Sequence, residues 1–485
     1  MQRFNNLNLR TTQDYVVASA PGQVDLQECS QRFHWGTFMA RSSITNRRIE
    51  ELTQAGRDIL ADAESKSRPF IGNIESVGVA KVGQGTRVRA LLYSHDTFGL
   101  GHLRRNLAIA DHLLERNPRF QVMLLSGSPV ADSWPLPPNL LLSLMPPVAK
   151  VGAEDYVSHD GKVSFAEVKR QREAVIIETI RAFQPDVFLV DHAPAGMKGE
   201  LLGALAYLRA SMPQTLTVLG LRDILDEGSV VRSLWREQDT YGLIERHYEQ
   251  VLVYGAPALF DVVEEYELPP AIADKLSYCG HVARPRPTVA RTESESTSNG
   301  KRVLVTVGGG GDGFPAIQTY LSALQRLNIR PEQSILVTGP LMPEDQQQYL
   351  EKVASQHADV RLMRSSTEMT RLLAEADLVV SMAGYNSTVE VLAAQKPAIL
   401  MPRAAPRAEQ RLRAELLAKM GLAWVVRPER GAVEQLAGLL DLALSGARPR
   451  GLGCGLLDLG GARRVGDVLE RLLEARISST SQDHG

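Results

Sequence analysis

The stretch HDTFGLGHLRRN contains the first group in the chain that could do chemistry. His102 follows Gly99 and Gly101, two glycines that let the chain turn sharply and approach a ligand closely, here the acceptor of a reaction. A neutral imidazole at this position could accept a proton from an acceptor hydroxyl. The spacing alone fits equally well with a histidine that caps a helix or packs at a domain edge. The motif therefore indicates a catalytic base only in combination with other features.

A second glycine-rich turn, VTVGGGGDG, is suited to binding an anion. Gly308, Gly309 and Gly310 begin a run of glycines with exposed backbone N–H groups, and the helix expected from Phe314 adds its positive end. Together these features favour a diphosphate. Asp312 would lie beside that anion, and we predict that it caps the helix instead. The pattern is neither a Walker loop nor a dinucleotide-binding motif, so the sequence does not support an ATPase or a dinucleotide-dependent enzyme.

A third turn, in SMAGYNSTVEV, leads from small residues into a helix with polar first residues. After Gly384 we expect the helix to open at Asn386, Ser387 and Thr388, with Glu390 in its first turn. The free N–H groups and hydroxyls would bind an anion, and Glu390 could accept two hydrogen bonds from a ribose diol. The alternative for Glu390 is a carboxylate that the helix dipole stabilises.

Two further polar pairs follow strands in the first half of the chain. Asp191 and His192 lie in LVDHAPAG, and Arg222 and Asp223 lie in LGLRDILDE. Because both pairs come at the carboxyl ends of expected strands, they should face a ligand cleft, where either could bind the acceptor or supply the base. Asp191 and His192 are the alternative catalytic pair to His102. Loop-fixing ion pairs and caps are the other interpretation of each residue.

Two series of alternating strands and helices must position these turns. The first series includes RVRALLYS, QVMLLSG, DVFLVD, LTVLGLRD and QVLVYG, and the second includes RVLVTVG, SILVTG, DVRLMR, ADLVVSMA, PAILMP and LAWVV. Such alternation is typical of βα units that wind a parallel sheet. The sequence therefore predicts two doubly wound α/β domains, with the ligand in the cleft between them, outside the carboxyl ends of the strands.

We divide the chain into five segments on this basis. They are a polar, partly disordered N-terminal extension with one short helical candidate (residues 1–86), a first α/β domain (87–281), a linker rich in Pro, Ser and Thr (282–300), a second α/β domain (301–476) and a tail (477–485). We expect the helix GARRVGDVLERLLEAR near the C-terminus to cross back and brace the first domain.

Composition excludes several classes of function. A formal net charge of −2 provides no bulk attraction to nucleic acid or acidic lipid. The 3 cysteines have no disulfide or zinc-site spacing, which fits a reducing, cytoplasmic environment and predicts no metal. No apolar run of about 18 residues occurs, so we expect no signal peptide and no membrane span. Peripheral membrane contact stays open.

The combination of GLGH, VGGGGDG and AGYNSTVE…QKPAILMPR…EQRLRAELL resembles the family 28 glycosyltransferases, which include the lipid-linked N-acetylglucosaminyltransferase of peptidoglycan synthesis. The resemblance covers about residues 88–475, and its C-terminal block is the specific part. With LVDHAPAG and GLRDILDE added, the pattern is similar to an uncharacterised bacterial group of predicted glycosyltransferases. It implies the GT-B fold, in which two Rossmann-like, doubly wound parallel-sheet domains face each other across a cleft.

The resemblance also implies an activity and roles for residues. The expected reaction moves a sugar from a nucleotide diphosphate, UDP by the family pattern, to an acceptor hydroxyl, without a metal or other cofactor and with inversion. By the same resemblance the first α/β domain binds the acceptor and the second binds the donor. His102 is then the base near the acceptor, Glu390 binds the ribose, and Glu409 and Gln410 contact the donor sugar. The family usually has two glutamines at these last positions. The acid at residue 409 therefore leaves the identity of the sugar open, and the acceptor is open as well.

Two other functions fit the same fold. A UDP-sugar 2-epimerase would need several carboxylates and histidines around the sugar in the second domain. In the sequence of that domain, His357 is the only histidine. A non-catalytic protein that binds nucleotide sugars would keep Glu390 and the glycine turns and would have no use for His102.

Overall fold

The computed structural model describes residues 87–95, 101–132, 136–150, 156–158, 163–283, 300–366, 368–403, 407–427 and 431–482. The predicted N-terminal extension with its helical candidate, Gly99 and most of the predicted linker lie outside the described residues.

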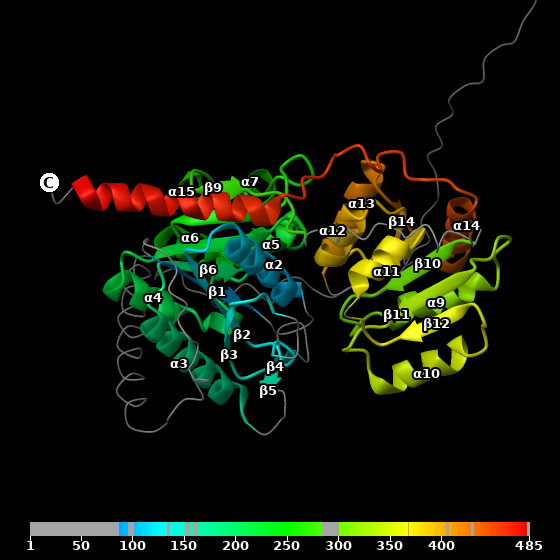
Figure 1. The fold of residues 1–485 in the computed structure, drawn as a ribbon, viewed down its shortest axis with the longest axis horizontal. Helices are drawn as coiled ribbons and strands as arrows, with labels where there is room; N and C mark the ends of the chain where they lie inside the picture. Colours follow the sequence, from blue (N-terminus) through cyan, green and yellow to red (C-terminus); the bar gives the residue numbers. More distant parts are fainter. Residues whose placement is uncertain are drawn as a thin grey trace, which may run out of the picture. The chain divides into compact units, whose positions relative to one another are not determined.

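The first half of the chain forms a seven-stranded parallel sheet in the order β3-β2-β1-β6-β7-β8-β9 (Figure 1). Its strands are β1 (Val88–Ser94), β2 (Phe120–Ser126), β3 (Leu141–Leu144), β6 (Val187–Asp191), β7 (Leu216–Arg222), β8 (Gln250–Tyr254) and β9 (Leu276–Tyr278), and β4 (Val148–Lys150) and β5 (Tyr156–Ser158) form a separate antiparallel pair. The helices are α2 (Gly101–Arg116), α3 (Phe165–Phe183), α4 (Leu202–Ser211), α5 (Gly228–Glu237), α6 (Thr240–His247), α7 (Val262–Glu265) and α8 (Pro270–Ala273), with a 3-10 turn at Met197–Gly199.

The second half forms a six-stranded parallel sheet in the order β12-β11-β10-β13-β14-β15. Its strands are β10 (Arg302–Thr306), β11 (Gln333–Val337), β12 (Val360–Met363), β13 (Leu378–Ser381), β14 (Ala398–Leu400) and β15 (Trp424–Val425). The helices of this half are α9 (Phe314–Leu324), α10 (Glu344–Ala354), α11 (Met369–Glu375), α12 (Tyr385–Ala393), α13 (Glu409–Lys419) and α14 (Ala432–Leu444), and α15 (Gly461–Gln482) follows them. The predicted pair of doubly wound sheets is confirmed.

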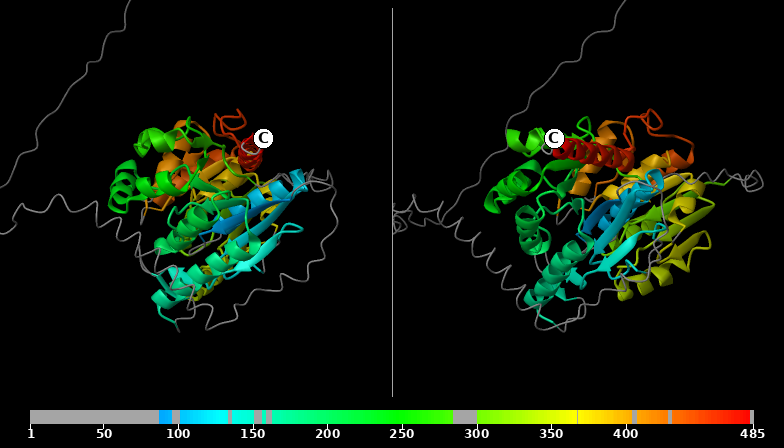
Figure 2. Two further views of the ribbon diagram at one scale, coloured as in Figure 1. Left: turned by 90° about the vertical axis from the view of Figure 1, so that its left-hand side faces the viewer. Right: turned by 60° about the vertical axis from the view of Figure 1, so that its left-hand side comes forward.

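Helices cover both faces of the first sheet, because its central strands are apolar on both sides (Figure 2). Successive residues of β1 alternate between two cores: Leu91 and Tyr93 pack in one cluster, and Ala90 and Leu92 pack in the other. A strand buried on both faces reads as a continuous apolar run, which is why RVRALLYS signalled a parallel strand.

Helix α15 returns from the second half and packs on α2, as the sequence predicted. Val465 and Leu469 join the core beneath α2, Arg116 pairs with Asp467 at 2.7 Å, and the Asn117 amide donates to the Glu470 carboxylate at 3.0 Å. The helix continues to Gln482, so the predicted tail at 477–485 is helical over its first part.

Both sheets reverse their strand order beside their first strand. β1 lies between β2 and β6, and β10 lies between β11 and β13. At such a reversal the connections after neighbouring strands leave toward opposite faces, which opens a crevice at the carboxyl ends. The residues that follow β1, β6, β10 and β13 are therefore the ones that the fold places at a ligand site.

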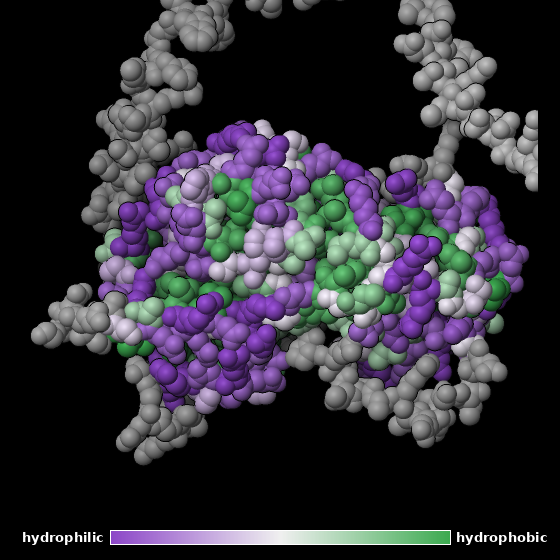
Figure 3. Space-filling model, turned by 90° about the horizontal axis from the view of Figure 1, so that it is seen from above, coloured by the Kyte–Doolittle hydropathy of each residue, from purple (hydrophilic) through white to green (hydrophobic). Residues whose placement is uncertain are grey.

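None of the helices in the described part of the chain combines the length and the apolar character needed to cross a bilayer. On the face drawn in Figure 3, hydrophobic residues lie in several separate groups among hydrophilic ones.

Candidate active site

A cavity of about 190 Å³ is lined by residues from both halves of the chain. From the first half come Gly101, His102, Arg104, Arg105 and Arg222, and from the second half come Val307, Gly308, Gly309, Gly310, Gly311, Asp312, Ser381, Met382, Gly384, Tyr385, Asn386, Ser387, Arg403 and Gln410. All three turns singled out in the sequence contribute to it. This cavity lies where the sequence predicts the ligand site, at the carboxyl ends of both sheets.

The turn after β10 has the backbone that only glycine adopts freely. Gly308 and Gly310 have φ angles of 66° and 93°, and a Cβ on Gly310 would lie 2.1 Å from the carbonyl oxygen of Thr338. The turn can therefore approach both its neighbouring loop and a ligand closely. Helix α9 begins at Phe314, as predicted.

The predicted capping role of Asp312 is wrong. The N-cap of α9 is Gly313, and no side chain caps this helix. Asp312 instead forms an ion pair with Arg403, which follows β14. Residue 313 and not residue 312 occupies the N-cap position, and the Asp312 carboxylate instead accepts a charge-assisted hydrogen bond from the Arg403 guanidinium.

Helix α12 begins at Tyr385, one residue earlier than predicted, with Gly384 as its N-cap. Glu390 therefore lies in the second turn and not in the first, where the helix dipole would have stabilised it most. Asn386 and Ser387 line the cavity, whereas Thr388 is buried.

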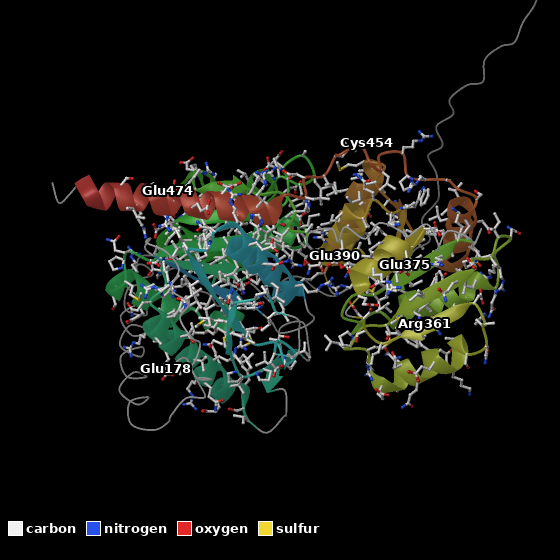
Figure 4. The ribbon with its side chains drawn as sticks, viewed as in Figure 1. Glu178, Arg361, Glu375, Glu390, Cys454 and Glu474 are labelled. Carbon is white, nitrogen blue, oxygen red and sulfur yellow. The ribbon has the colours of Figure 1, made fainter. Side chains whose placement is uncertain are left out.

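The side chains of α12 contact helix α2 of the first half. Glu390, labelled in Figure 4, accepts a hydrogen bond from Arg104, and the Asn386 amide donates to the carbonyl oxygen of Gly101 at 2.8 Å. Glu390 is not among the described residues that line the cavity, whereas its partner Arg104 is. The predicted ribose ligand thus has a protein partner in this structure.

His102 forms a hydrogen-bonded pair with the buried Asp191. The His102 Nδ1 atom lies 2.7 Å from Asp191 Oδ2, and Arg105 donates to both Asp191 oxygens, at 2.9 and 2.7 Å. Burial alone would raise the pKa of Asp191, but the Arg105 guanidinium and the hydrogen bond from His102 outweigh it and hold that pKa below its usual range. An ionised Asp191 favours the tautomer with the proton on Nδ1, which leaves His102 Nε2 free to accept a proton.

Three histidines pack around this pair. The ring centroid of His102 lies 5.6 Å from that of His95 and 5.3 Å from that of His192. Burial is the main cause that lowers the pKa of both neighbours well below 6.5, and nearby guanidinium charges, Arg172 for His95 and Arg222 for His192, lower it further. His95 and His192 are therefore neutral near pH 7, while His102 keeps its carboxylate partner.

Four arginines line the cavity, and among the described lining residues Asp312 is the one carboxylate. Arg403 also pairs with Glu409 at 2.8 Å, and the Arg222 guanidinium donates to His192 Nε2 at 3.2 Å. Burial, reinforced by neighbouring cations, lowers the pKa of Arg222 to about 10. Among the described residues no group of three or more His, Cys, Asp or Glu side chains is arranged to hold a metal ion.

Some predicted residues lie outside the cavity. Asp223 is fully buried and accepts hydrogen bonds from Arg413 of the second half and from His281, both at 3.3 Å, so it contributes to the contact between the halves. Glu409 is buried against Arg403. Gln410 does line the cavity, and its side-chain oxygen accepts a hydrogen bond from the Arg403 backbone at 3.1 Å.

Sequence reasoning missed four residues that shape the site. Arg105 lies one turn after His102 on α2, and that spacing could have indicated that the two share a partner. His95 directly follows β1, and its position at the carboxyl end of a central strand was a usable signal. Nothing local distinguishes Arg104 from a surface arginine, because Glu390 lies far away in the sequence, and the pairing of Arg403 with the distant Asp312 was equally hidden.

Residues 303–448 match the glycosyltransferase family 28 C-terminal domain. The UDP-N-acetylglucosamine--N-acetylmuramyl-(pentapeptide) pyrophosphoryl-undecaprenol N-acetylglucosamine transferase of Alkaliphilus metalliredigens is 24% identical over 346 residues, which are 68% of this chain and 83% of that protein. The protein of the same name from Leuconostoc mesenteroides is 36% identical over 96 residues, which are 19% of this chain. That match spans only 26% of the length of the relative.

Solved structures share the fold. A UDP-glucosyltransferase from Polygonum tinctorium, solved as a complex with 3,4-dichloroaniline, matches with a TM-score of 0.53 and 15% identity, covering 81% of this chain and 100% of that one. A putative UDP-N-acetylglucosamine 2-epimerase from Listeria monocytogenes matches with a TM-score of 0.52 and 13% identity, covering 82% and 98%. Likeness at this level of identity identifies the two-domain GT-B architecture and does not separate the two activities.

Proposed function

We propose that this chain, which is related to the family 28 glycosyltransferases and carries their C-terminal domain, transfers a sugar from a UDP-sugar to an acceptor hydroxyl. One observation supports the proposal above all. The same cavity joins a glycine-rich turn and a helix start suited to a diphosphate with an imidazole that has a carboxylate partner. A binding site needs the first two features, and a base-catalysed transfer needs all three.

The donor would lie against the second half. The turn at 308–311 and the start of α12 line the cavity, where their backbone N–H groups would bind the diphosphate, and the Arg403 guanidinium lies beside them. These groups can stabilise the charge that builds on the departing diphosphate, so the proposal needs no metal ion. Glu390 would exchange Arg104 for the ribose hydroxyls. The choice of UDP rests on the relatives, which are named for UDP-N-acetylglucosamine.

The acceptor would approach from the first half. His102 Nε2 takes the proton of the attacking hydroxyl while its oxygen forms the new bond to the anomeric carbon and the bond to the diphosphate breaks. Attack opposite the leaving group inverts the anomeric centre. Asp191 orients the ring and stabilises the imidazolium that forms, as a buried carboxylate can do for a catalytic histidine. The two catalytic candidates from the sequence, His102 and the Asp191–His192 pair, thus belong to one cluster.

Nucleotide binding is the first test of this proposal. We expect calorimetric titration with UDP, GDP, dTDP and ADP to give the tightest binding for UDP, and Glu390→Ala to weaken it strongly. Protein that is well folded and binds none of the four would refute the glycosyltransferase assignment.

Turnover tests the base. His102→Gln should lower the rate of UDP release from a UDP-sugar by about 10²–10⁴-fold and leave the affinity for UDP unchanged. His112→Gln is the matched control, because His112 lies on the same helix away from the cavity. Turnover that survives His102→Gln at the wild-type rate would contradict the assignment of His102 as the base. A sugar epimerised at C2 would favour the epimerase alternative.

We also propose that the reaction takes place in the cytoplasm. Cys279 and Cys454 are free thiols in the structure, as expected for a protein of a reducing compartment.

A further inference from the structure

The arginines of the cavity differ in how their charge is balanced. Arg104 pairs with Glu390, Arg105 pairs with Asp191, and Arg403 pairs with two carboxylates. Arg222 has no carboxylate within 4.0 Å among the described residues. The Arg222 guanidinium donates a hydrogen bond to the neutral His192. Its Nε atom is buried and has no hydrogen-bond partner among the described residues. The cavity therefore contains one cation that the described part of the protein leaves uncompensated.

An uncompensated cation in this position costs stability. Arg222 is only partly exposed. Burial and then the charges of Arg105, Arg413 and Arg407 lower its pKa, and among the described residues the Glu409 carboxylate acts in the opposite direction. Glu409 is already engaged by Arg403. Partly buried charges in proteins are normally paired, and an arginine fork is suited to the two oxygens of a phosphate or carboxylate. The missing anion is best explained as part of a ligand.

The position of Arg222 indicates which ligand carries that anion. Arg222 ends β7 in the first half, and its guanidinium reaches His192, whose ring stacks on His102. It is therefore on the side of the proposed base. The glycine turn and the start of α12, which suit the donor diphosphate, belong to the second half and have Arg403 beside them.

We propose that Arg222 binds an acidic group, a phosphate or a carboxylate, that the acceptor carries close to the hydroxyl receiving the sugar. The inference rests on the proposed function and deepens it, because it assigns the acceptor to the class of anionic molecules. His192 holds the guanidinium in place through Nε2, and its left-handed backbone, with φ of 73°, fixes the ring between Arg222 and His102. The acidic group on Arg222 would set how far the acceptor hydroxyl lies from His102 Nε2.

Inorganic phosphate is the probe for this site, with the donor site blocked. The full-length protein is saturated with UDP and titrated calorimetrically with phosphate, for the wild type, Arg222→Gln and Arg222→Lys. We expect phosphate to bind the UDP-saturated wild type, Arg222→Gln to weaken that binding at least tenfold, and Arg222→Lys to weaken it less, because it keeps the charge without the fork. Arg236→Gln, an exposed arginine on α5, should change nothing.

The titration with UDP alone separates the two sources of an anion. We expect the affinity of Arg222→Gln for UDP to stay within twofold of the wild type. A loss of UDP affinity as large as the loss of phosphate affinity would assign Arg222 to the donor diphosphate and overturn the inference. Absence of phosphate binding to the UDP-saturated wild type would overturn it too, while the proposed function stands. Failure of the wild type to bind UDP at all would instead overturn the proposed function.

Thermal unfolding provides a readout that does not depend on a ligand of known identity. If Arg222 is an uncompensated cation, Arg222→Gln should unfold at the same or a higher temperature, and phosphate should raise the midpoint of the wild type more than that of the variant. A lower midpoint for the variant, with equal responses to phosphate, would show that Arg222 only supports the fold.

Discussion

Replacing Arg104 with glutamine should tighten the binding of a nucleoside. In the structure the Arg104 guanidinium donates a hydrogen bond to the carboxylate of Glu390, which we propose as the residue that binds the ribose. A ribose must therefore displace the guanidinium before it can bind. The side chains of the pair are 19% and 17% exposed, which makes it a partly buried ion pair. Removing Arg104 abolishes this competition and leaves an ionised carboxylate at the mouth of the site.

The expected magnitude follows from the exposure of the pair. Fully exposed ion pairs contribute about 0.2–1 kcal/mol, and hydrogen bonds to charged groups in less exposed places contribute about 1.5–3 kcal/mol. A value of about 1 kcal/mol corresponds to roughly a fivefold lower Kd. Glu390→Gln should act in the opposite direction and raise the Kd about tenfold or more, because the ribose hydroxyls then lose an ionised acceptor.

Uridine is the appropriate ligand for this test, because it lacks the phosphates that Arg104 could contact from the cavity wall. Titration calorimetry on Arg104→Gln, Glu390→Gln and the double variant completes a cycle, with Arg116→Gln as a control on the same helix. In the Glu390→Gln background the substitution of Arg104 should have no effect. Unchanged or weaker uridine binding by Arg104→Gln, or the same gain in both backgrounds, would refute the reasoning.

Two further predictions concern stability. Tyr385→Phe should lower the free energy of unfolding by about 1–3 kcal/mol, because the buried hydroxyl accepts from the Val282 N–H at 3.1 Å and donates to the Tyr254 carbonyl at 2.9 Å; denaturant unfolding that matches the wild type would contradict this. The second prediction concerns His95 and His192, whose pKa values are lowered in the folded protein. Their contribution to the free energy of unfolding is complete above about pH 6.5, the pKa of histidine in the unfolded chain, and is lost as the pH falls below it. Below that pH each histidine should add about 1.4 kcal/mol per pH unit to the slope of the unfolding free energy against pH. His192→Asn should remove the part of this slope that His192 contributes, when unfolding is measured from about pH 5 to 7.5. Asparagine is chosen because it tolerates the positive φ at this position.

Local sequence signals were sufficient for the architecture. Runs such as RVLVTVG and ADLVVSMA are mainly apolar and end in glycine or small residues, and the structure forms strands Arg302–Thr306 and Leu378–Ser381 within them. The glycines that follow β10 adopt positive φ angles that other residues disfavour, so that turn was also readable. These features depend on backbone geometry and on the period of burial, which neighbouring residues determine.

Tertiary structure decided how the charged residues are paired. Arg104 meets a carboxylate 286 positions away, and Arg413 reaches Asp223 across 190 positions. Neither pairing is encoded by spacing, because it depends on which faces of α2, α12 and α13 the two sheets bring together. Asp312 illustrates the consequence. Its local context favoured a helix cap, but it forms an ion pair with Arg403, which follows a different strand.

The sequence by itself therefore determined the two parallel sheets, the glycine turn and the histidine at the start of α2, since these follow from local conformation and burial. Only the tertiary structure decided that Asp191 serves His102, that Glu390 is held by Arg104 and that Arg222 has no carboxylate partner among the described residues. The physical reason is that the energy of a charge depends on every neighbour within a few ångströms, whatever its distance along the chain.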